Sequence, residues 1–207
     1  MSKYLFPMLA MALLLSFFRL GSVTLFDVDE AVFAEATKEM VLNGDWITPT
    51  YNGDNRYDKP ILFYWLMAVS YKVFGISEFS ARVPSAITAL LLSLSVFLFV
   101  RRFSDVKTAF YATVPLVLSP YFLIYSHAAV TDMTLTLMIT LSLFSFYIAV
   151  VADSDTPGLK ATSGKPNIFI YGFHAFSALA FLTKGLIGIL FPFGIAITYL
   201  VATEGLA

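Results

Sequence analysis

The 207-residue chain contains no cysteine and few charged residues. Without cysteine it can form neither a disulfide nor a thiolate metal site, and its redox compartment is left open. Only 13% of its residues are charged, against about 25% in ordinary soluble domains. Hydrophobic residues make up 58%, and the mean hydropathy is +0.80. This composition predicts a polytopic membrane protein.

Several functional signatures are also missing. The formal net charge is -1, and no basic stripe interleaved with aromatic residues is present, so we expect no nucleic-acid partner. The sequence has no zinc-type ligand spacing, no phosphate-cradling glycine loop and no nucleophile elbow. Any chemistry must therefore come from side chains scattered along the chain.

Long apolar runs are the dominant feature, and a membrane-spanning helix needs about 20 such residues. The run after Lys3 is expected to be a retained helix, because no small-residue cleavage site of a signal peptide precedes Asp27. The pair Lys184-Gly185 divides the last run in two. The predicted fold is an all-α bundle of six membrane helices, over residues of about 4–22, 83–100, 108–126, 131–151, 167–183 and 186–202.

Residues 61–75 decide the topology, because counting them as a span would reverse every later helix. The run has only about 15 residues and is interrupted by Lys72, so we expect a helix that lies in the membrane interface. The loop over residues 23–82 then faces the outside. The basic residues that share the other, cytoplasmic side under the positive-inside rule are Lys3, Arg101, Arg102, Lys107, Lys160 and Lys165.

The first external loop concentrates acidic residues, with 8 of the 14 in the chain lying between positions 27 and 58. A helix is expected from about residue 27 to 42, ended by Asn43-Gly44. Asn52-Gly53 predicts a hairpin turn. Pro60 is expected at the first position of the interfacial helix.

Two aspartates in this loop are candidates for chemistry. Asp29 opens the external helix and Asp58 precedes Lys59. In one interpretation, Asp27 or Asp29 caps the helix expected from about residue 27 to 42, and Asp58 caps the interfacial helix. Lys59 is then a snorkelling lysine, with its ammonium group in the membrane interface. The other sets Asp29 and Asp58 opposite each other as reactive carboxylates, while Lys59 neutralises a phosphate.

Isolated charges at the helix edges form a second group. A charge near the bilayer centre costs about 2.5–3.5 kcal/mol, so Asp132 and Lys184 are functional candidates. They can equally serve as a helix cap and an interfacial anchor. Arg82 is expected to mark a membrane edge, and His127 and His174 are expected to be structural.

These motifs together resemble a known family. The loop reads DVDEAVFAEATKEMVLNGDWITPTYNGDNRYDKPILFYWL and is followed by FGISEFSARVPSA, TDM and TKG. It is similar to the first periplasmic loop of the ArnT-like glycosyltransferases, which are lipid A aminoarabinose transferases, and of their relatives in the dolichyl-phosphate-mannose-protein mannosyltransferase family. The similarity covers nearly the whole chain. It implies the GT-C fold in a bacterial inner membrane, with a cytoplasmic N-terminus and a periplasmic active site.

The resemblance also implies a reaction and a site. The donor is a polyprenyl-phosphate sugar, and the acceptor is lipid A, a protein or another glycan. A divalent metal ion is the one cofactor implied. The site residues implied are Asp29, Glu30 and Asp58 as catalytic carboxylates, Asp29 and Asp58 as metal ligands, Lys59 and Lys184 on the donor phosphate, and Asp132, Tyr57 and Arg82 in the pocket.

The chain departs from the family pattern in two places and ends early. Val32-Phe33 stands where the family often has Arg-Tyr, and Asp58 is one methylene shorter than the usual glutamate. Family members continue into further membrane helices and a periplasmic domain, so we expect residues 1–207 to be the N-terminal part of such a protein. The alternatives are a non-catalytic membrane protein, such as a transporter or a subunit that binds lipid headgroups, or an inactive fragment.

Overall fold

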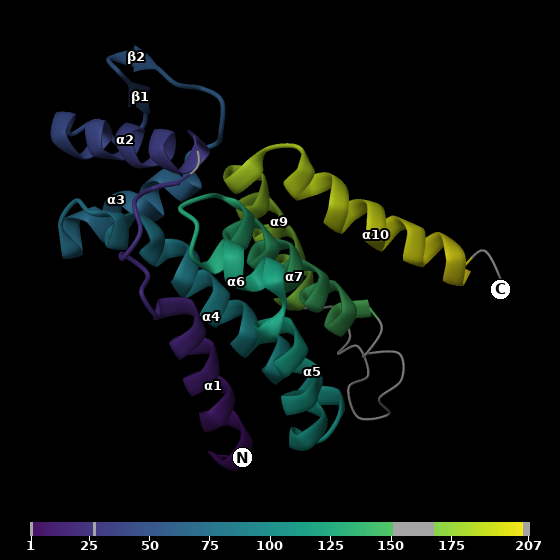
Figure 1. Ribbon diagram of the computed structural model, residues 1–207. Helices are drawn as coiled ribbons and strands as arrows, with labels where there is room; N and C mark the ends of the chain where they lie inside the picture. The colour runs from purple at the N-terminus through teal and green to yellow at the C-terminus, as the bar shows by residue number, and fades with distance from the viewer. Residues whose placement is uncertain (1, 27, 151–167, 205–207) are drawn as a thin grey trace. The chain divides into compact units, whose positions relative to one another are not determined.

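The computed structural model describes residues 2–26, 28–150 and 168–204, and the chain forms two compact units, residues 1–137 and 138–207. Nine helices and one short β-hairpin lie within the described ranges (Figure 1). The predicted all-α membrane fold is confirmed. By length and composition, two of the described helices can cross a membrane alone, and one bent pair can do so together. Six crossings remain a prediction.

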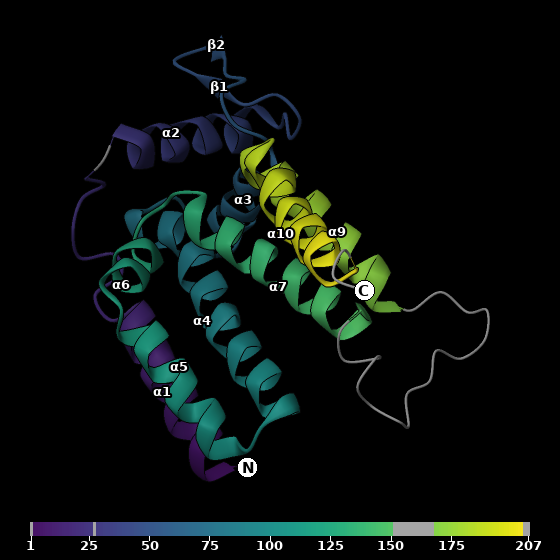
Figure 2. The ribbon, with the colours of Figure 1, turned by 90° about the vertical axis from the view of Figure 1, so that its right-hand side faces the viewer.

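The first unit is built around a long central helix, α4, that packs against α1, α3, α5 and α6. Figures 1 and 2 place α2 and the hairpin at one end of this unit and the start of α1 at the other. Its elements are α1 (Ser2–Phe17), α2 (Val28–Asn43), β1 (Thr50–Tyr51), β2 (Asp54–Asn55), α3 (Leu62–Phe74), α4 (Glu78–Phe103), α5 (Val106–Leu118), α6 (Pro120–Ser126) and the first turn of α7 (Asp132–Val150).

Helix α4 starts earlier than the apolar run from residue 83 predicts. The Ser77 hydroxyl accepts the amide of Ser80 at 3.3 Å, and the Ser80 hydroxyl accepts the amide of Ser77 at 3.0 Å, which is a capping box. The helix therefore begins at Glu78, and Arg82 lies inside it rather than ahead of it.

The predicted span over residues 108–126 is two helices. Ser119 is extended at φ -67° and ψ 140°, and the chain bends by 66° between α5 and α6. The residue before a proline is disfavoured in the helical conformation, so Pro120 ends α5 and begins α6. The Ser119 hydroxyl caps α6 by accepting the amide of Phe122 at 3.3 Å.

Turns in the loop over residues 23–82 follow the predicted glycine positions. Gly44 has φ +72° directly after α2, and Asn52 and Gly53 have φ +54° and +83° between β1 and β2. A two-residue turn with both φ values positive matches the right-handed twist of the strands. The helix stop and the hairpin are confirmed, whereas α3 begins at Leu62 and not at Pro60.

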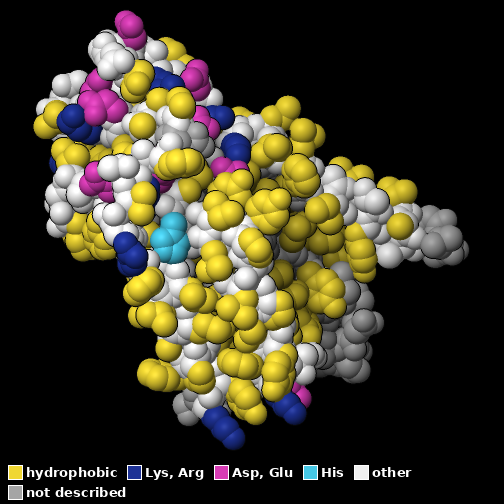
Figure 3. Space-filling model, in the orientation of Figure 1, with side chains coloured by type: hydrophobic (Ala, Val, Ile, Leu, Met, Phe, Trp, Pro, Cys, Tyr) yellow, Lys and Arg dark blue, Asp and Glu magenta, His cyan; other side chains and the backbone are white. Residues whose placement is uncertain are grey.

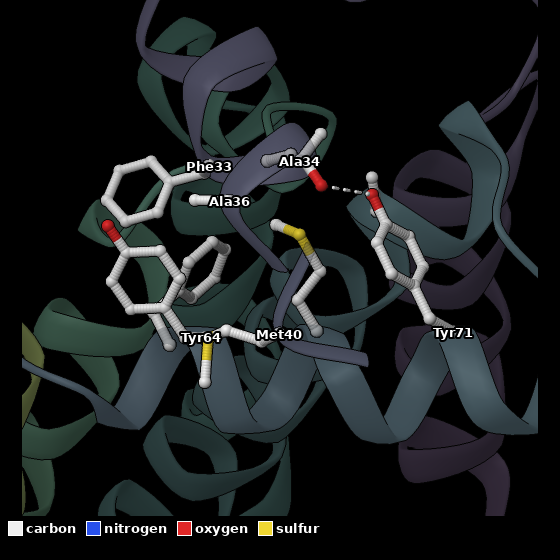
Figure 4. Close-up of a cluster of buried hydrophobic side chains, with 10 residues drawn as sticks. Phe33, Ala34, Ala36, Met40, Tyr64 and Tyr71 are labelled. Atoms are coloured by element: carbon white, nitrogen blue, oxygen red, sulfur yellow. Dashed lines mark hydrogen bonds between the residues drawn. The ribbon is translucent and has the colours of Figure 1, made fainter. Parts of the chain in front are cut away.

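One face of α2 is buried against α3, which gives the loop over residues 23–82 a hydrophobic core of its own (Figure 4). The Phe33 ring packs at 5.0 Å from the ring of Tyr64, and Met40 is buried in the same cluster. The Tyr71 hydroxyl donates to the Ala34 carbonyl at 3.3 Å. Because Phe33 fills this core, the Val32-Phe33 departure from the family pattern is a packing feature here.

The second unit contains the rest of α7 with α9 (Ile168–Lys184) and α10 (Ile187–Glu204). Gly185, at φ +72°, follows α9, so the turn predicted at Lys184-Gly185 is confirmed. The hydroxyls of Ser142 on α7 and Ser177 on α9 lie 2.8 Å apart in a buried contact. Residues 152–166, which separate the predicted spans 131–151 and 167–183, lie outside the described residues.

Charge is segregated along the first unit. In Figure 3, acidic and basic side chains gather over α2 and the hairpin, and a largely hydrophobic surface follows below them. Lys3 lies at the start of α1, and Arg101 and Arg102 lie in the last turn of α4, at the opposite end (Figure 1). This agrees with the predicted grouping of the basic residues. Which end is cytoplasmic remains a prediction.

Candidate functional site

A buried ion pair joins the start of α2 to α4. Glu30 and Arg82 are 3% and 5% exposed. The Arg82 Nε donates to Glu30 Oε1 at 2.9 Å, and Nη2 donates to Oε2 at 3.0 Å. Glu30 also accepts the backbone amides of Ala129 at 2.6 Å and Phe26 at 3.0 Å. Each carboxylate oxygen therefore accepts two hydrogen bonds.

Arg82 uses its remaining donors on the chain between α1 and α2. Nη1 donates to the carbonyls of Leu20 at 3.2 Å and Val23 at 2.7 Å, and Nη2 donates to that of Thr24 at 3.1 Å. The sequence predicts a membrane-edge or pocket arginine at this position. In the structure these bonds fix where the chain leaves α1 and enters α2, and the pocket role of Arg82 stays a prediction.

The environment of Glu30 favours its ionised form. Burial raises the pKa of Glu30, but the hydrogen bonds from Arg82, Ala129 and Phe26 together lower it below its ordinary value. A carboxylate whose two oxygens already accept four hydrogen bonds has little capacity left for a proton or a ligand. The geometry thus favours a positioning role for Glu30, and its predicted catalytic role remains a prediction.

Asp29 differs from its neighbour. It lies in the first turn of α2, and its side chain is exposed. Among the described residues it has no hydrogen-bond or ion-pair partner, so no capping bond of Asp29 is seen there. Capping by Asp27 lies outside the described residues. The Glu30–Arg82 pair thus holds the backbone of this turn in place. The adjacent carboxylate of Asp29 is exposed and, among the described residues, accepts no hydrogen bond.

A second polar cluster lies between the hairpin and α3. The Arg56 Nε donates to the Tyr64 hydroxyl at 3.1 Å, and Nη1 lies 3.0 Å from Asp58 Oδ2. Burial raises the pKa of Tyr64, the hydrogen bond from Arg56 lowers it, and the charges of Asp58 and Asp29 raise it further. Both predicted aspartates therefore lie within electrostatic range of the Tyr64 hydroxyl.

The two residues that flank Asp58 have different surroundings. Tyr57 is 76% exposed. Lys59 is half-buried, and within the described parts of the chain its ammonium group has no ion-pair partner. An unpaired cation beside a segment that carries carboxylates is suited to meet an anionic ligand such as a phosphate.

Three more residues fix the loop, and none of them is among the predicted site residues. Glu39 accepts the Thr50 hydroxyl at 2.6 Å and the amides of Asn52 at 2.7 Å and Gly53 at 3.3 Å, which ties the hairpin to α2. Arg56 and Tyr64 link the hairpin exit to α3. The only available signal for Glu39 was an acidic residue upstream of an Asn-Gly turn.

The remaining candidates belong to other elements. Asp132 is the first residue of α7 and is half-buried. Lys184 is the last residue of α9, in the second unit. His127 has its Nδ1 2.9 Å from the Leu123 carbonyl and its Nε2 3.2 Å from that of Phe18, in keeping with the structural role expected for it.

The carboxylates of this region offer few ligands for a metal ion. Within the described residues, no group of three or more His, Cys, Asp or Glu side chains could hold a metal ion. Asp58 already pairs with Arg56. Two carboxylates fit only an ion that completes its shell with water and substrate oxygens, as Mg²⁺ commonly does.

Comparisons with known proteins give the site its context. Residues 58–207 match the family model described as dolichyl-phosphate-mannose-protein mannosyltransferase. The chain is 34% identical over 185 residues to an undecaprenyl phosphate-alpha-4-amino-4-deoxy-L-arabinose arabinosyl transferase of Shewanella sediminis, covering 88% of the chain and 32% of the relative. An uncharacterized protein of Aquifex aeolicus is 32% identical over 201 residues, covering 97% and 38%. The chain thus spans about a third of its relatives' length.

A solved structure shares the fold. ArnT from Cupriavidus metallidurans, in its crystal structure bound to undecaprenyl phosphate, is 28% identical with a TM-score of 0.86. The match covers 98% of this chain and 36% of that one. The apo crystal structure of the same protein gives a TM-score of 0.85.

Proposed function

Because the chain belongs to the dolichyl-phosphate-mannose-protein mannosyltransferase family, we propose that it acts in an inverting transfer of a sugar from a polyprenyl-phosphate donor. The acceptor proposed is lipid A, a protein or another glycan. The reaction is proposed to take place at the periplasmic face of a bacterial inner membrane. Relatives named as arabinosyl transferases that use undecaprenyl phosphate sugars support this donor class.

One observation carries the proposal. Asp29 is an exposed carboxylate without a partner among the described residues, and it is next in sequence to a buried, saturated ion pair. A general base must be accessible and held at a fixed position. Glu30 and Arg82 provide the fixed position, so we assign them to positioning and Asp29 to catalysis.

The proposed steps follow from charge. As the bond between the anomeric carbon and the phosphate oxygen breaks, positive charge builds on the sugar and negative charge builds on the departing lipid phosphate. The Asp29 carboxylate takes the proton of an acceptor hydroxyl, or orients an acceptor that is already anionic, while the acceptor oxygen attacks the opposite face of the sugar. Lys59 meets the phosphate, because a fixed cation stabilises charge where it develops. A contact of Lys184 with the phosphate is proposed from the resemblance alone.

Membranes of cells that express the protein provide the test. They are incubated with labelled polyprenyl-phosphate sugars, and the labelled cellular fraction identifies the acceptor. We expect Asp29→Asn to abolish transfer, because the amide cannot accept the proton, while expression and thermal stability stay at the wild-type level. Unchanged turnover in this variant refutes the assignment. Donor binding without transfer by the wild type supports the alternative of a headgroup-binding protein.

A divalent cation is a second, separate part of the proposal. Asp29 and Asp58 would hold it, and it would supply positive charge to the departing phosphate. Arg56 already provides a positive charge to Asp58 at 3.0 Å. Transfer measured with EDTA, and again after Mg²⁺ is restored, decides whether the reaction needs the ion.

A further inference from the structure

Arg56 is held at three points around the exit of the hairpin. Its backbone amide donates to the Pro49 carbonyl at 2.8 Å, across the hairpin. Its guanidinium contacts the Tyr64 hydroxyl at 3.1 Å and Asp58 at 3.0 Å. The Arg56 side chain is only 16% exposed, whereas that of Asp58 is 68% exposed. The arginine, rather than the aspartate, is the anchored partner of this pair.

The anchor itself is rigid. Tyr64 is completely buried, and its ring packs against Phe33 of α2. Helix α2 carries Asp29 in its first turn. The chain of contacts from Phe33 through Tyr64 to Arg56 therefore connects the helix of the proposed base to the segment of Asp58 and Lys59.

Ile61 holds the far end of that segment by packing against the hydrophobic core of α2 and α3, and Arg56 holds the near end. Residues 56–61, between β2 and α3, form no helix or strand. Tyr57 is largely exposed, and Lys59 has no ion-pair partner among the described residues. A planar guanidinium can bind two partners in a defined geometry, which a lysine ammonium on a flexible stem does not do.

We propose that Arg56, anchored on Tyr64, is a positioning residue for sugar transfer. It keeps Asp58 and Lys59 at a fixed position relative to Asp29. This inference rests on the proposed function. It assigns a role to two residues that are not among the predicted site residues. It also explains why a mostly exposed aspartate is accompanied by a mostly buried arginine.

The kinetic test compares Arg56→Gln, Arg56→Lys and Tyr64→Phe in the membrane transfer assay. We expect Arg56→Gln to lower kcat/KM about 10- to 100-fold, with a raised KM for the donor, because a small misplacement of reacting groups has effects of this size. Arg56→Lys should not restore activity. Tyr64→Phe should give a smaller loss, and adding it to Arg56→Gln should bring no further loss, because the hydroxyl acts through Arg56.

Lys38→Gln is the matched control. It also removes one positive charge from the loop, but from a pair with Glu35 whose side chains are 39% and 40% exposed. We expect it to transfer sugar at the wild-type rate. Transfer by Arg56→Gln at the wild-type rate, or additive losses in the double variant, overturns the inference. If the wild type transfers no sugar, the proposed function fails instead.

A second readout does not depend on activity. Because the chain has no cysteine, Tyr57→Cys creates a unique position for a nitroxide spin label. The electron paramagnetic resonance spectrum should show a more mobile label when Arg56→Gln or Tyr64→Phe is added, and no change when Lys38→Gln is added. Unchanged mobility in both former variants shows that Arg56 does not hold the segment, and overturns the inference.

Discussion

Replacing Glu30 with glutamine tests how the start of α2 is held. Oε1 accepts from Arg82 Nε and Ala129, and Oε2 accepts from Arg82 Nη2 and Phe26. Glutamine places an NH₂ group against two of these four donors in either orientation and leaves the Arg82 charge unpaired. Breaking a buried ion pair from one side costs about 3–5 kcal/mol. That is a large part of a typical stability of about 5–15 kcal/mol.

The loss should appear as a lower melting temperature of the detergent-purified protein. For a chain of this length, about 2–4 °C is lost per kcal/mol, so we expect a decrease of about 6–20 °C. Glu35→Gln, the same change on the same helix, is the control. Its pair with Lys38 is exposed, and such pairs contribute about 0–1 kcal/mol. Equal shifts for the two variants would refute the structural role of the Glu30–Arg82 pair.

The dependence of the melting temperature on pH, at acidic pH, gives an independent check on the role of Glu30. The pKa of Glu30 is lower in the folded protein than its ordinary value of 4.5. Its stabilising contribution is therefore fully present above pH 4.5 and is lost as the pH falls through the lower folded pKa. Below pH 4.5 the wild type should lose melting temperature more steeply than Glu30→Gln. Parallel curves would contradict this assignment.

Two further predictions concern the hairpin and the second unit. Glu39→Gln should speed amide hydrogen exchange at the hairpin tip at neutral pH. The difference from the wild type should vanish as the pH falls through the pKa of Glu39, which is lowered mainly by the hydrogen bond from the Thr50 hydroxyl. Equal exchange at neutral pH would show that Glu39 does not hold the tip. Gly188→Ala should destabilise the packing of α9 on α10 by about 1–3 kcal/mol, because its Cβ would collide with the Ala180 backbone. Gly194→Ala is the control: nothing lies within 4 Å of its Cβ, so it should be neutral or stabilising in thermal melts. Similar melting temperatures for the two variants would contradict this packing.

Sequence reasoning located the turns because their causes are local. Gly44, Gly53 and Gly185 all adopt the positive φ that glycine tolerates, and each follows a helix or sits in a two-residue turn. The break at Ser119-Pro120 was equally local, since proline restricts the residue before it. It was missed because the apolar run continues through it, and hydropathy does not register a change of backbone direction.

The extent of α4 was missed for a different reason. The apolar run begins after Arg82, and a charged residue at the edge of such a run predicts the end of a membrane helix. The capping box at Ser77 and Ser80 starts the helix five residues earlier than the predicted residue 83, at Glu78. Hydropathy marks where a helix meets the membrane, whereas hydrogen bonds of the first turn mark where the helix begins.

The partners of Glu30 could not be read from a single sequence, because Arg82 lies 52 residues away and Ala129 lies 99 residues away. The sequence alone gives no basis for telling Asp29 from Glu30, since both are acids in the first turn of the same helix. Burial separates them: both oxygens of the glutamate bond to two distant residues, Arg82 and Ala129, and to the nearby Phe26, whereas the aspartate makes none of these bonds. A base must exchange its proton during each turnover, so within this Asp-Glu pair only the uncommitted carboxylate suits that role. The same reasoning predicts that exchanging the two residues, as Asp29→Glu with Glu30→Asp, should cost both stability and transfer, because the shorter acid would no longer reach Arg82.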